Sequence, residues 1–269
     1  MRLHGRMAES VMITGAAAGI GRASAQRLLD AGYRVGAYDV DAAGLESLAA
    51  EQGTAVADGR LVTGRLDVTD PEEWVARLVE FTEASGGALD VLVNNAGILS
   101  SGAFEEIPLA RQRLMVDVNV GGVLNGCHSA HPYLAAAPRP RVLNLCSASA
   151  IYGQAELATY SATKFAIRGL TEALDLEWRA QGIRVTALWP LFVSTGMVDG
   201  MDIGTTRSLG VRLTAADVAD AVLAVAQEPR RRTWSVHRAV GRQAKAMLAS
   251  SEITPSWVLR RVNGRITAH

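Results

Sequence analysis

Six short apolar segments alternate along the chain with longer amphipathic stretches, and this alternation restricts the possible folds more than any other feature of the sequence. The apolar segments are nearly continuous, which is typical of strands buried on both faces. Strands and helices that alternate in this way form a parallel sheet with helices on both faces. The sequence therefore predicts an α/β fold with a doubly wound sheet of about seven strands. The apolar segments span residues 10–14, 34–39, 60–67, 90–95, 141–147 and 183–190, and the amphipathic stretches span 22–31, 71–84, 111–136 and 159–181.

No internal repeat or low-complexity linker divides the chain, so one domain is predicted over residues 8–239. Residues 191–213 lack a clear periodicity and follow the carboxyl end of a predicted strand. This position favours a mobile loop that covers a binding site as a lid. Residues 240–269 form a basic extension: from residue 230 onward the chain carries nine Lys or Arg and one acid, although its overall net charge is zero. We expect this tail to pack on the acidic remainder of its own or a partner chain. Contact with a phosphorylated substrate handle, or with an anionic membrane surface, is the weaker alternative.

Composition and short motifs argue against several classes of protein. Zero net charge gives no general attraction to nucleic acid. No run of roughly 18 apolar residues occurs, which disfavours a membrane span, and the N-terminal residues do not resemble a secretion signal. Cys127 and Cys146 lie in apolar or small-residue surroundings, so we expect reduced core thiols in a cytoplasmic protein. Cys127, His128 and His131 provide too few convergent ligands for a zinc site, so no metal is expected.

A glycine-rich turn, "TGAAAGIG" at residues 14–21, follows the first predicted strand and begins the first helix. Its glycines, Gly15, Gly19 and Gly21, allow the backbone to approach a pyrophosphate closely, and the N–H groups of the following helix attract the anion. Such a turn alone could be an ordinary tight turn. Its place between a strand and a helix favours a dinucleotide site that includes these glycines and Ile20.

The second predicted strand ends at Asp39. A carboxylate at this place accepts hydrogen bonds from the adenosine ribose and repels a 2′-phosphate. Ala16, Ala17 and Val40 offer no cation for that phosphate, so NAD is predicted rather than NADP. Alternatively, Asp39 only caps the helix that begins near Asp41.

The third predicted strand leads to Asp67 and Val68, which we expect to lie near the adenine. Asp67 could instead cap the next helix, although Thr69 or Asp70 would serve that purpose equally well.

The stretch "YSATK" at residues 160–164 contains one of only two lysines in the chain; the other is Lys245. At positions i and i+4 of a helix, Tyr160 and Lys164 share one face. An adjacent ammonium stabilises a phenolate, which suits Tyr160 to accept or donate a proton. Lysine also offers three rotatable donors to the nicotinamide ribose, which the rigid fork of arginine does not match.

With the glycine-rich turn, "NNAG" at 94–97 and "YSATK" in this order and spacing, residues 8–230 resemble the classical short-chain dehydrogenase/reductase family. The resemblance implies a Rossmann-type fold and a catalytic group of Asn119, Ser147, Tyr160 and Lys164. Ser147 would bond the substrate oxygen, with Ser149 as a rival for that role. Asn119 would hold a water that links Lys164 to solvent.

The resemblance also implies further contacts. The cofactor would meet the residues Asn94, Ala96, Gly97, Tyr160, Lys164, Pro190, Val193 and Thr195, and the substrate would meet Ser149, Leu191, Phe192 and Met197. Two positions depart from the family pattern. Leu191 follows Pro190 where the family usually has glycine, which reduces backbone freedom beside the nicotinamide, and Cys146 stands where serine is frequent.

These features together predict an NAD(H)-dependent oxidoreductase that interconverts a secondary alcohol and a ketone. The apolar lid residues favour a hydrophobic, steroid-, retinoid- or lipid-like substrate. The alternatives are a 3-oxoacyl thioester reductase and a non-catalytic NAD-binding protein. The family resemblance also implies a homotetramer or dimer built on the long helices at 111–136 and 159–181.

Overall fold

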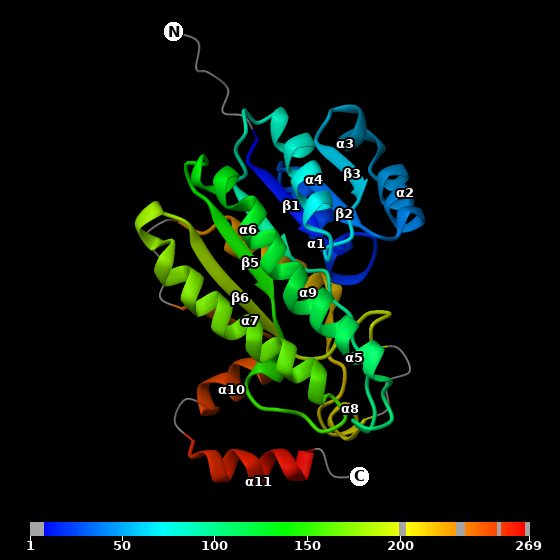
Figure 1. Cartoon of the computed structure of the whole chain (residues 1–269), viewed down its shortest axis with the longest axis vertical. Coiled ribbons are helices and arrows are strands. Elements are labelled where there is room, and N and C mark those ends of the chain that lie inside the picture. Colours follow the sequence, from blue (N-terminus) through cyan, green and yellow to red (C-terminus); the bar gives the residue numbers. More distant parts are fainter. Residues whose placement is uncertain (1–7, 199–202, 230–234, 252–253, 267–269) are drawn as a thin grey trace.

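The computed structural model describes residues 8–198, 203–229, 235–251 and 254–266. Its centre is a sheet of seven parallel strands in the order β3-β2-β1-β4-β5-β6-β9 (Figure 1). The predicted doubly wound α/β sheet is therefore confirmed. The direction in which the sheet grows reverses between β1 and β4, which leaves a crevice at the carboxyl ends of these two strands. The strands are β1 (Ser10–Thr14), β2 (Arg34–Asp39), β3 (Leu61–Arg65), β4 (Val91–Asn94), β5 (Arg141–Leu145), β6 (Arg184–Pro190) and β9 (His237–Val240).

Alternate residues of the central strands enter two separate hydrophobic cores, one on each face of the sheet. In β1, Val11 and Ile13 enter the first core and Met12 enters the second. The first core is covered by α1 (Gly19–Asp30), α2 (Ala42–Glu51) and α9 (Ala215–Ala226). The second is covered by α4 (Pro71–Glu83), α6 (Gly122–Ala135) and α7 (Ala158–Glu177). Because both faces are covered, the strands need the continuous apolar sequence that predicted them.

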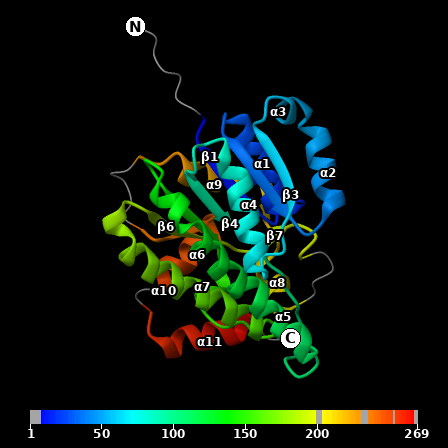
Figure 2. The same cartoon turned by 45° about the horizontal axis from the view of Figure 1, so that its top comes forward.

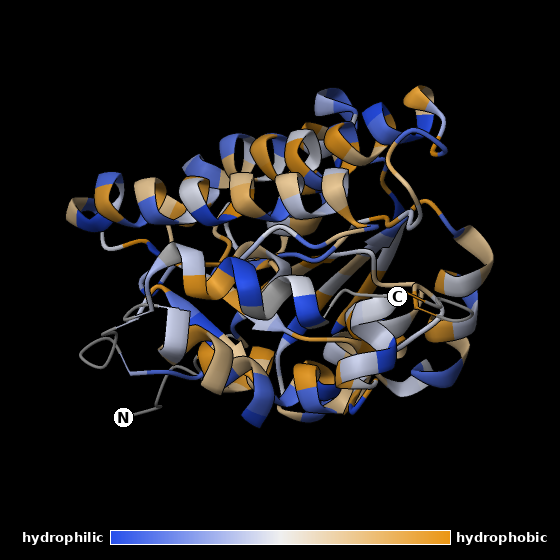
Figure 3. Cartoon of the chain, turned by 90° about the horizontal axis from the view of Figure 1, so that it is seen from below, coloured by the Kyte–Doolittle hydropathy of each residue, from blue (hydrophilic) through white to orange (hydrophobic). Residues whose placement is uncertain are grey.

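Helices on both sides of the sheet are visible in Figure 2, where α2 and the short α3 (Gly53–Ala57) lie beside the edge strand β3. Figure 3 shows hydrophilic and hydrophobic residues alternating along the helices, the pattern of amphipathic helices with one buried face. Among the described residues, no helix is both long and apolar enough to cross a membrane.

The predicted helix over 111–136 is interrupted. It consists of α5 (Leu109–Val116), one turn of π-helix (Asp117–Gly121) and α6. A π turn inserts an extra residue into the helix and shifts the faces on either side of it. The hydrophobic pattern alone does not reveal such an insertion. The turn contains Asn119, one of the predicted catalytic residues.

The C-terminal region joins the main body of the protein. Strand β9 crosses the expected boundary between residues 239 and 240, and Met247 and Leu248 of α10 (Arg242–Ser251) pack against the second core. Helix α11 (Ser256–Ile266) contacts α8 (Gly204–Leu209), which lies within the predicted lid (Figure 1). The lid also contains β7 (Val193–Ser194), which pairs with β8 (Leu213–Thr214). Residues 199–202 of the predicted lid, residues 252–253 and 267–269 of the basic extension, and residues 230–234 before it lie outside the described residues.

Both cysteines are free and buried, Cys127 in α6 and Cys146 just after β5. Burial raises the pKa of Cys127 to about 12 and that of Cys146 to about 11. Because only the thiolate reacts with alkylating reagents, the folded protein is expected to resist iodoacetamide at about pH 8. Both thiols should react after unfolding in guanidinium. Mass spectrometry checks this prediction, and rapid labelling of the folded protein would contradict the buried placement.

Candidate active site

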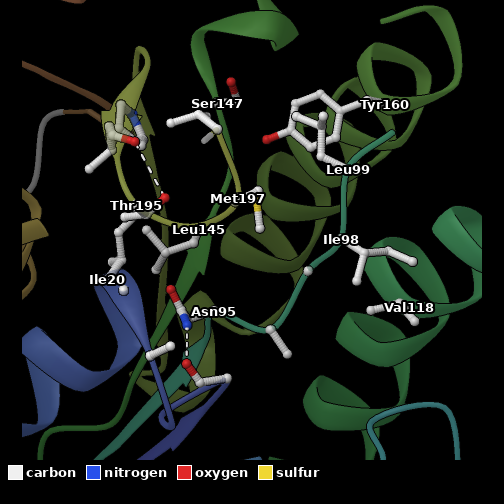
Figure 4. Close-up of a pocket in the computed structure, with 18 of the residues that line it drawn as sticks. Ile20, Asn95, Ile98, Leu99, Val118, Leu145, Ser147, Tyr160, Thr195 and Met197 are labelled. Atoms are coloured by element: carbon white, nitrogen blue, oxygen red, sulfur yellow. Dashed lines mark hydrogen bonds between the residues drawn. The ribbon is translucent and has the colours of Figure 1, made fainter. Parts of the chain in front are cut away.

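A cavity of about 440 Å³ opens in the crevice at the carboxyl ends of the central strands (Figure 4). Parallel α/β sheets bind ligands at this place. The glycine-rich turn and the ends of β2 and β3 form one part of its wall, and the segment after β5, helix α7 and the segment after β6 form the other. Loops that are far apart in the sequence therefore meet around one cavity.

The glycine-rich turn borders the cavity through Gly15, Gly19 and Ile20. Gly15 and Gly19 have φ angles of +67° and +53°, which other L-residues rarely adopt. A Cβ on Gly15 would lie 2.8 Å from the Cα atom of Ala96. Gly21 does not line the cavity, but a Cβ there would lie 2.0 Å from the carbonyl oxygen of Gly15. The third glycine thus allows α1 to pack closely against the turn.

The "NNAG" segment divides between core and cavity. Asn94, predicted to contact a cofactor or else to have a mainly structural role, is buried away from the cavity and donates a hydrogen bond of 2.9 Å to Oδ1 of Asn144. The neighbouring Asn95 lines the cavity and donates to the carbonyl oxygens of Thr14 (2.9 Å) and Gly15 (3.0 Å). Asn95 was expected as part of a turn that passes close to the cofactor, but not as a contact of its own. The alternation of side chains along β4 was the available signal, because it places residues 94 and 95 on opposite sides. Ala96 and Gly97 line the cavity, as expected.

Asp39 lies at the cavity and supports the glycine-rich turn. Its Oδ2 atom accepts a hydrogen bond of 3.0 Å from the backbone N–H of Ala17. Helix α2 is capped by Asp41, whose carboxylate accepts from the N–H of Gly44. Asp39 therefore does not serve as the cap of this helix.

Asp67 and Val68 also line the cavity. Oδ1 of Asp67 accepts hydrogen bonds from the hydroxyl (2.7 Å) and backbone N–H (2.9 Å) of Thr69, and these bonds lower the pKa of Asp67. Asp70 caps α4 by accepting from two backbone N–H groups. The carboxylate of Asp67 therefore stays ionised at the cavity wall.

Tyr160 and Lys164 both line the cavity from α7. Lys164 is buried, and its Nζ atom lies 5.4 Å from the centre of the Tyr160 ring and donates to the carbonyl oxygen of Leu145 at 2.9 Å. Ser147 borders the same cavity as the Tyr160 hydroxyl (Figure 4). Its Oγ atom lies 3.1 Å from Oγ of Ser149 and accepts from the N–H of Ser149. The two serines weighed as rivals thus form one hydrogen-bonded pair.

Asn119 lies behind the cavity wall rather than in it. Its Oδ1 atom accepts from the backbone N–H of Ile98 at 2.8 Å, and its Nδ2 atom donates to the carbonyl oxygen of Ile98 at 2.9 Å. Nδ2 also lies 3.2 Å from the hydroxyl of Thr163 on α7. The side chain therefore ties the segment after β4 to α7, and Ile98 itself lines the cavity.

The remaining wall is mainly apolar. All the predicted lid contacts border the cavity: Pro190, Leu191, Phe192, Val193, Thr195 and Met197. Phe192 packs with Leu157 and Ile203 in a small cluster against Leu99 and Val198. Sequence reasoning missed Ile98, Leu99, Val118, Leu145 and Gln154 in this wall. Ile98, Leu99 and Gln154 lie in loops, Val118 lies in the π turn, and Leu145 ends β5.

Comparison with known proteins identifies this arrangement. A model of the short chain dehydrogenase family matches residues 9–204. The chain belongs to the short chain dehydrogenase family. The predicted membership is thus confirmed, and this dehydrogenase is an oxidoreductase that acts on CH–OH groups.

Three relatives illustrate the similarity of this dehydrogenase to known proteins. The 3-alpha-(or 20-beta)-hydroxysteroid dehydrogenase of Mycobacterium tuberculosis is 35% identical over 232 residues, which cover 84% of each chain. The 3-ketoacyl-(acyl-carrier-protein) reductase of Brucella melitensis, solved with NADH, is 28% identical with a TM-score of 0.77 over 86% of this chain and 95% of its own. A short chain dehydrogenase/reductase of Burkholderia phymatum, solved with NAD, is 25% identical with a TM-score of 0.79 over 94% and 95% of the two chains.

Proposed function

We propose that this dehydrogenase interconverts a hydrophobic secondary alcohol and its ketone, with NAD(H) as the redox partner and Tyr160 as the proton acceptor or donor. One observation carries the proposal: Tyr160, Lys164 and Ser147 line the same cavity as the glycine-rich turn and Asp39. A proton-transfer group thus borders the space in which a nicotinamide cofactor would lie.

The cavity wall fits a dinucleotide. A Cβ at Gly15 would lie 2.8 Å from the Cα atom of Ala96, so glycine here lets the turn pack against the segment after β4 while its backbone borders the cavity. Helix α1 begins at Gly19 on the cavity wall, where its first N–H groups would favour an anion. Gly15, Gly19 and Ile20 would hold the pyrophosphate, Asp39 the adenosine ribose, and Lys164 the nicotinamide ribose. When bound, NAD supplies the redox chemistry by taking up a hydride from the alcohol carbon.

The protein's own side chains manage the proton. In alcohol oxidation the hydroxyl oxygen of Tyr160, as phenolate, accepts the proton of the substrate hydroxyl. The ammonium of Lys164 stabilises the negative charge on that oxygen before the transfer. Ser147 Oγ donates a hydrogen bond to the substrate oxygen, and its contact with Ser149 fixes its position. In ketone reduction Tyr160 donates the proton instead. Asn119 holds Ile98 and α7 together behind Tyr160 and Lys164 through its hydrogen bonds.

The preference for NAD over NADP rests on Asp39. The double variant Asp39→Ser, Val40→Arg removes a carboxylate that repels a 2′-phosphate and adds a cation at an exposed position of the cavity wall. We expect the ratio of kcat/KM for NADP to kcat/KM for NAD to rise by about 100-fold, because each charged hydrogen bond contributes about 1.5–3 kcal/mol. Initial rates with both cofactors test this, and Val40→Arg alone separates the added attraction from the lost repulsion. A wild-type preference for NADP would contradict the role of Asp39.

The substrate class is proposed from the apolar wall and from the relatives. Leu99, Leu191 and Phe192 provide apolar surface in the cluster that also includes Tyr160, and the mycobacterial relative is a hydroxysteroid dehydrogenase. A 3-oxoacyl thioester reductase is the second candidate, because the Brucella neighbour is such an enzyme and was solved with NADH. A preference for NAD, which we assign to Asp39, therefore does not distinguish the two candidate functions. Reduction of a 3-oxosteroid and of acetoacetyl-CoA by NADH, compared at equal concentration, tests which candidate holds.

A non-catalytic NAD-binding protein is the weakest candidate, because Ser147, Tyr160 and Lys164 all line the cavity. A homo-oligomer in the cytoplasm is part of the proposal. Support for the oligomer comes from exposed apolar side chains on α5, α6 and α7, namely Leu114, Val116, Leu124, Phe165 and Leu176. The two free thiols support a reducing compartment.

A further inference from the structure

The substrate end of the cavity holds a polar side chain that the proposed chemistry does not use. Gln154 lies in the segment between β5 and α7, and it lines the cavity together with the apolar lid residues. The charged side chains of the lining are Asp39, Asp67 and Lys164, which the proposed function places with the cofactor and the catalytic group. Gln154 is therefore an uncharged hydrogen-bonding group within a mainly apolar wall.

The backbone around Gln154 is held firmly beside the catalytic helix. The N–H of Gln154 donates to the hydroxyl of Ser161 at 3.1 Å, one residue beyond Tyr160. Two residues later, Glu156 has a φ of +61°, and its carbonyl oxygen accepts from the N–H of Gly102 at 2.9 Å. Its carboxylate accepts from the N–H of Gly204 in the lid at 3.2 Å. The position of residue 154 relative to Tyr160 is thus fixed by several hydrogen bonds.

The amide of Gln154 has no hydrogen-bond partner among the described residues. The side chain is 3% exposed, and its Oε1 and Nε2 atoms are both shielded from solvent. The hydroxyl of Tyr152 is close: burial raises the pKa of Tyr152 and the amide lowers it in part, but no hydrogen bond of ordinary geometry joins the two side chains. Even if the amide nitrogen donated a hydrogen bond to the Tyr152 hydroxyl, the amide oxygen Oε1 would still accept none. A buried unpaired polar group costs about 1–3 kcal/mol, which a bound partner can recover.

We propose that Gln154 recognises a second, uncharged oxygen of the substrate, a hydroxyl or carbonyl group remote from the carbon that is oxidised or reduced. This inference rests on the proposed function and narrows its substrate class to alcohols and ketones with two oxygen functions. An amide both donates and accepts hydrogen bonds, so it suits either group. The terminal torsion of a glutamine is broad, so the amide can present either its oxygen or its nitrogen to a partner at low cost. A carboxylate is disfavoured because its charge would be desolvated against the lid.

The test compares ketones that have the same shape and differ in the second oxygen. Two pairs serve with NADH: 4-hydroxycyclohexanone against 4-methylcyclohexanone, and 17β-hydroxy-5α-androstan-3-one against 5α-androstan-3-one. We expect the hydroxylated member of the pair that the enzyme accepts to have a kcat/KM about tenfold higher. Gln154→Met keeps the length of the side chain and removes the amide. In this variant the kcat/KM values of the two ketones should differ by no more than about twofold, and kcat/KM for the ketone without the hydroxyl should stay nearly unchanged. Equal rates within both pairs for the wild type would overturn the inference.

Controls separate this role from structural ones. Tyr152→Phe removes the neighbouring hydroxyl and should keep the tenfold ratio; a loss equal to that of Gln154→Met would show that the amide acts through Tyr152 and would overturn the proposal. If Gln154→Met does not fold, Gln154→Asn retracts the amide and should lose the ratio as well. If no ketone is turned over, the proposed function fails. The inference is then decided by the Tm of the NADH-loaded protein, which the hydroxylated members should raise more than their partners, and equal shifts would overturn it.

Discussion

Replacement of Tyr160 with Phe is expected to lower kcat by about 10²–10⁴-fold, the contribution typical of a positioned acid or base. The variant removes only the hydroxyl group at the cavity wall, so the ring can keep its packing against the cluster of Leu157, Phe192 and Ile203. NADH binding should therefore stay close to that of the wild type. Initial rates and a fluorescence titration with NADH measure the two effects separately.

A matched control for this substitution is Tyr152→Phe. Tyr152 packs against the second core and does not line the cavity. We expect kcat to change little in this variant. Substantial residual activity in Tyr160→Phe, or an equal loss in both variants, would show that Tyr160 is not the proton-transfer group.

Replacement of Gly21 with Ala is expected to destabilise the fold by about 3 kcal/mol and to abolish NADH binding. The added Cβ would lie 2.0 Å from the carbonyl oxygen of Gly15 and 2.6 Å from Nδ2 of Asn95. Because backbone cannot rotate away as a side chain can, α1 must move relative to the glycine-rich turn. Urea unfolding and NADH titration test both parts of this prediction.

Gly53→Ala is the control for Gly21→Ala. Gly53 begins the short helix α3 at an exposed position, and a Cβ there would meet no atom within 4 Å. Its free energy of unfolding and its affinity for NADH should stay near the wild-type values. If Gly21→Ala also kept them, the close packing of α1 on the turn would be contradicted.

Most of the fold was predictable from the sequence because buried parallel strands leave a strong signal. Strands β1 and β2 have the predicted bounds, and the other four predicted strands agree within two residues at each end. Strand β9, "HRAV", was not located in advance because His237 and Arg238 break its apolar run. It exists because it pairs with β6, a contact that local sequence does not encode.

The candidate site was predictable where a motif joins residues within one local element. Tyr160 and Lys164 share a helix face, so their spacing alone predicted that they lie together. Gln154 was missed because its place in the cavity wall depends on how loops that are distant in the sequence come together. The interrupted helix at Asn119 was missed for a different reason: a π turn changes the register of a helix without changing its hydrophobic pattern.

The most direct test of the account is the change in nicotinamide absorbance when the purified protein is mixed with NAD and 3α- or 20β-hydroxysteroids. Wild-type protein is expected to reduce NAD, and Tyr160→Phe is expected to bind NADH with kcat lowered by about 10²–10⁴-fold. NAD reduction by Tyr160→Phe at the wild-type rate would contradict the proposed proton transfer. Tight binding of NADH by the wild type, without turnover of any alcohol or ketone from short aliphatic compounds to steroids, would contradict the proposed reaction.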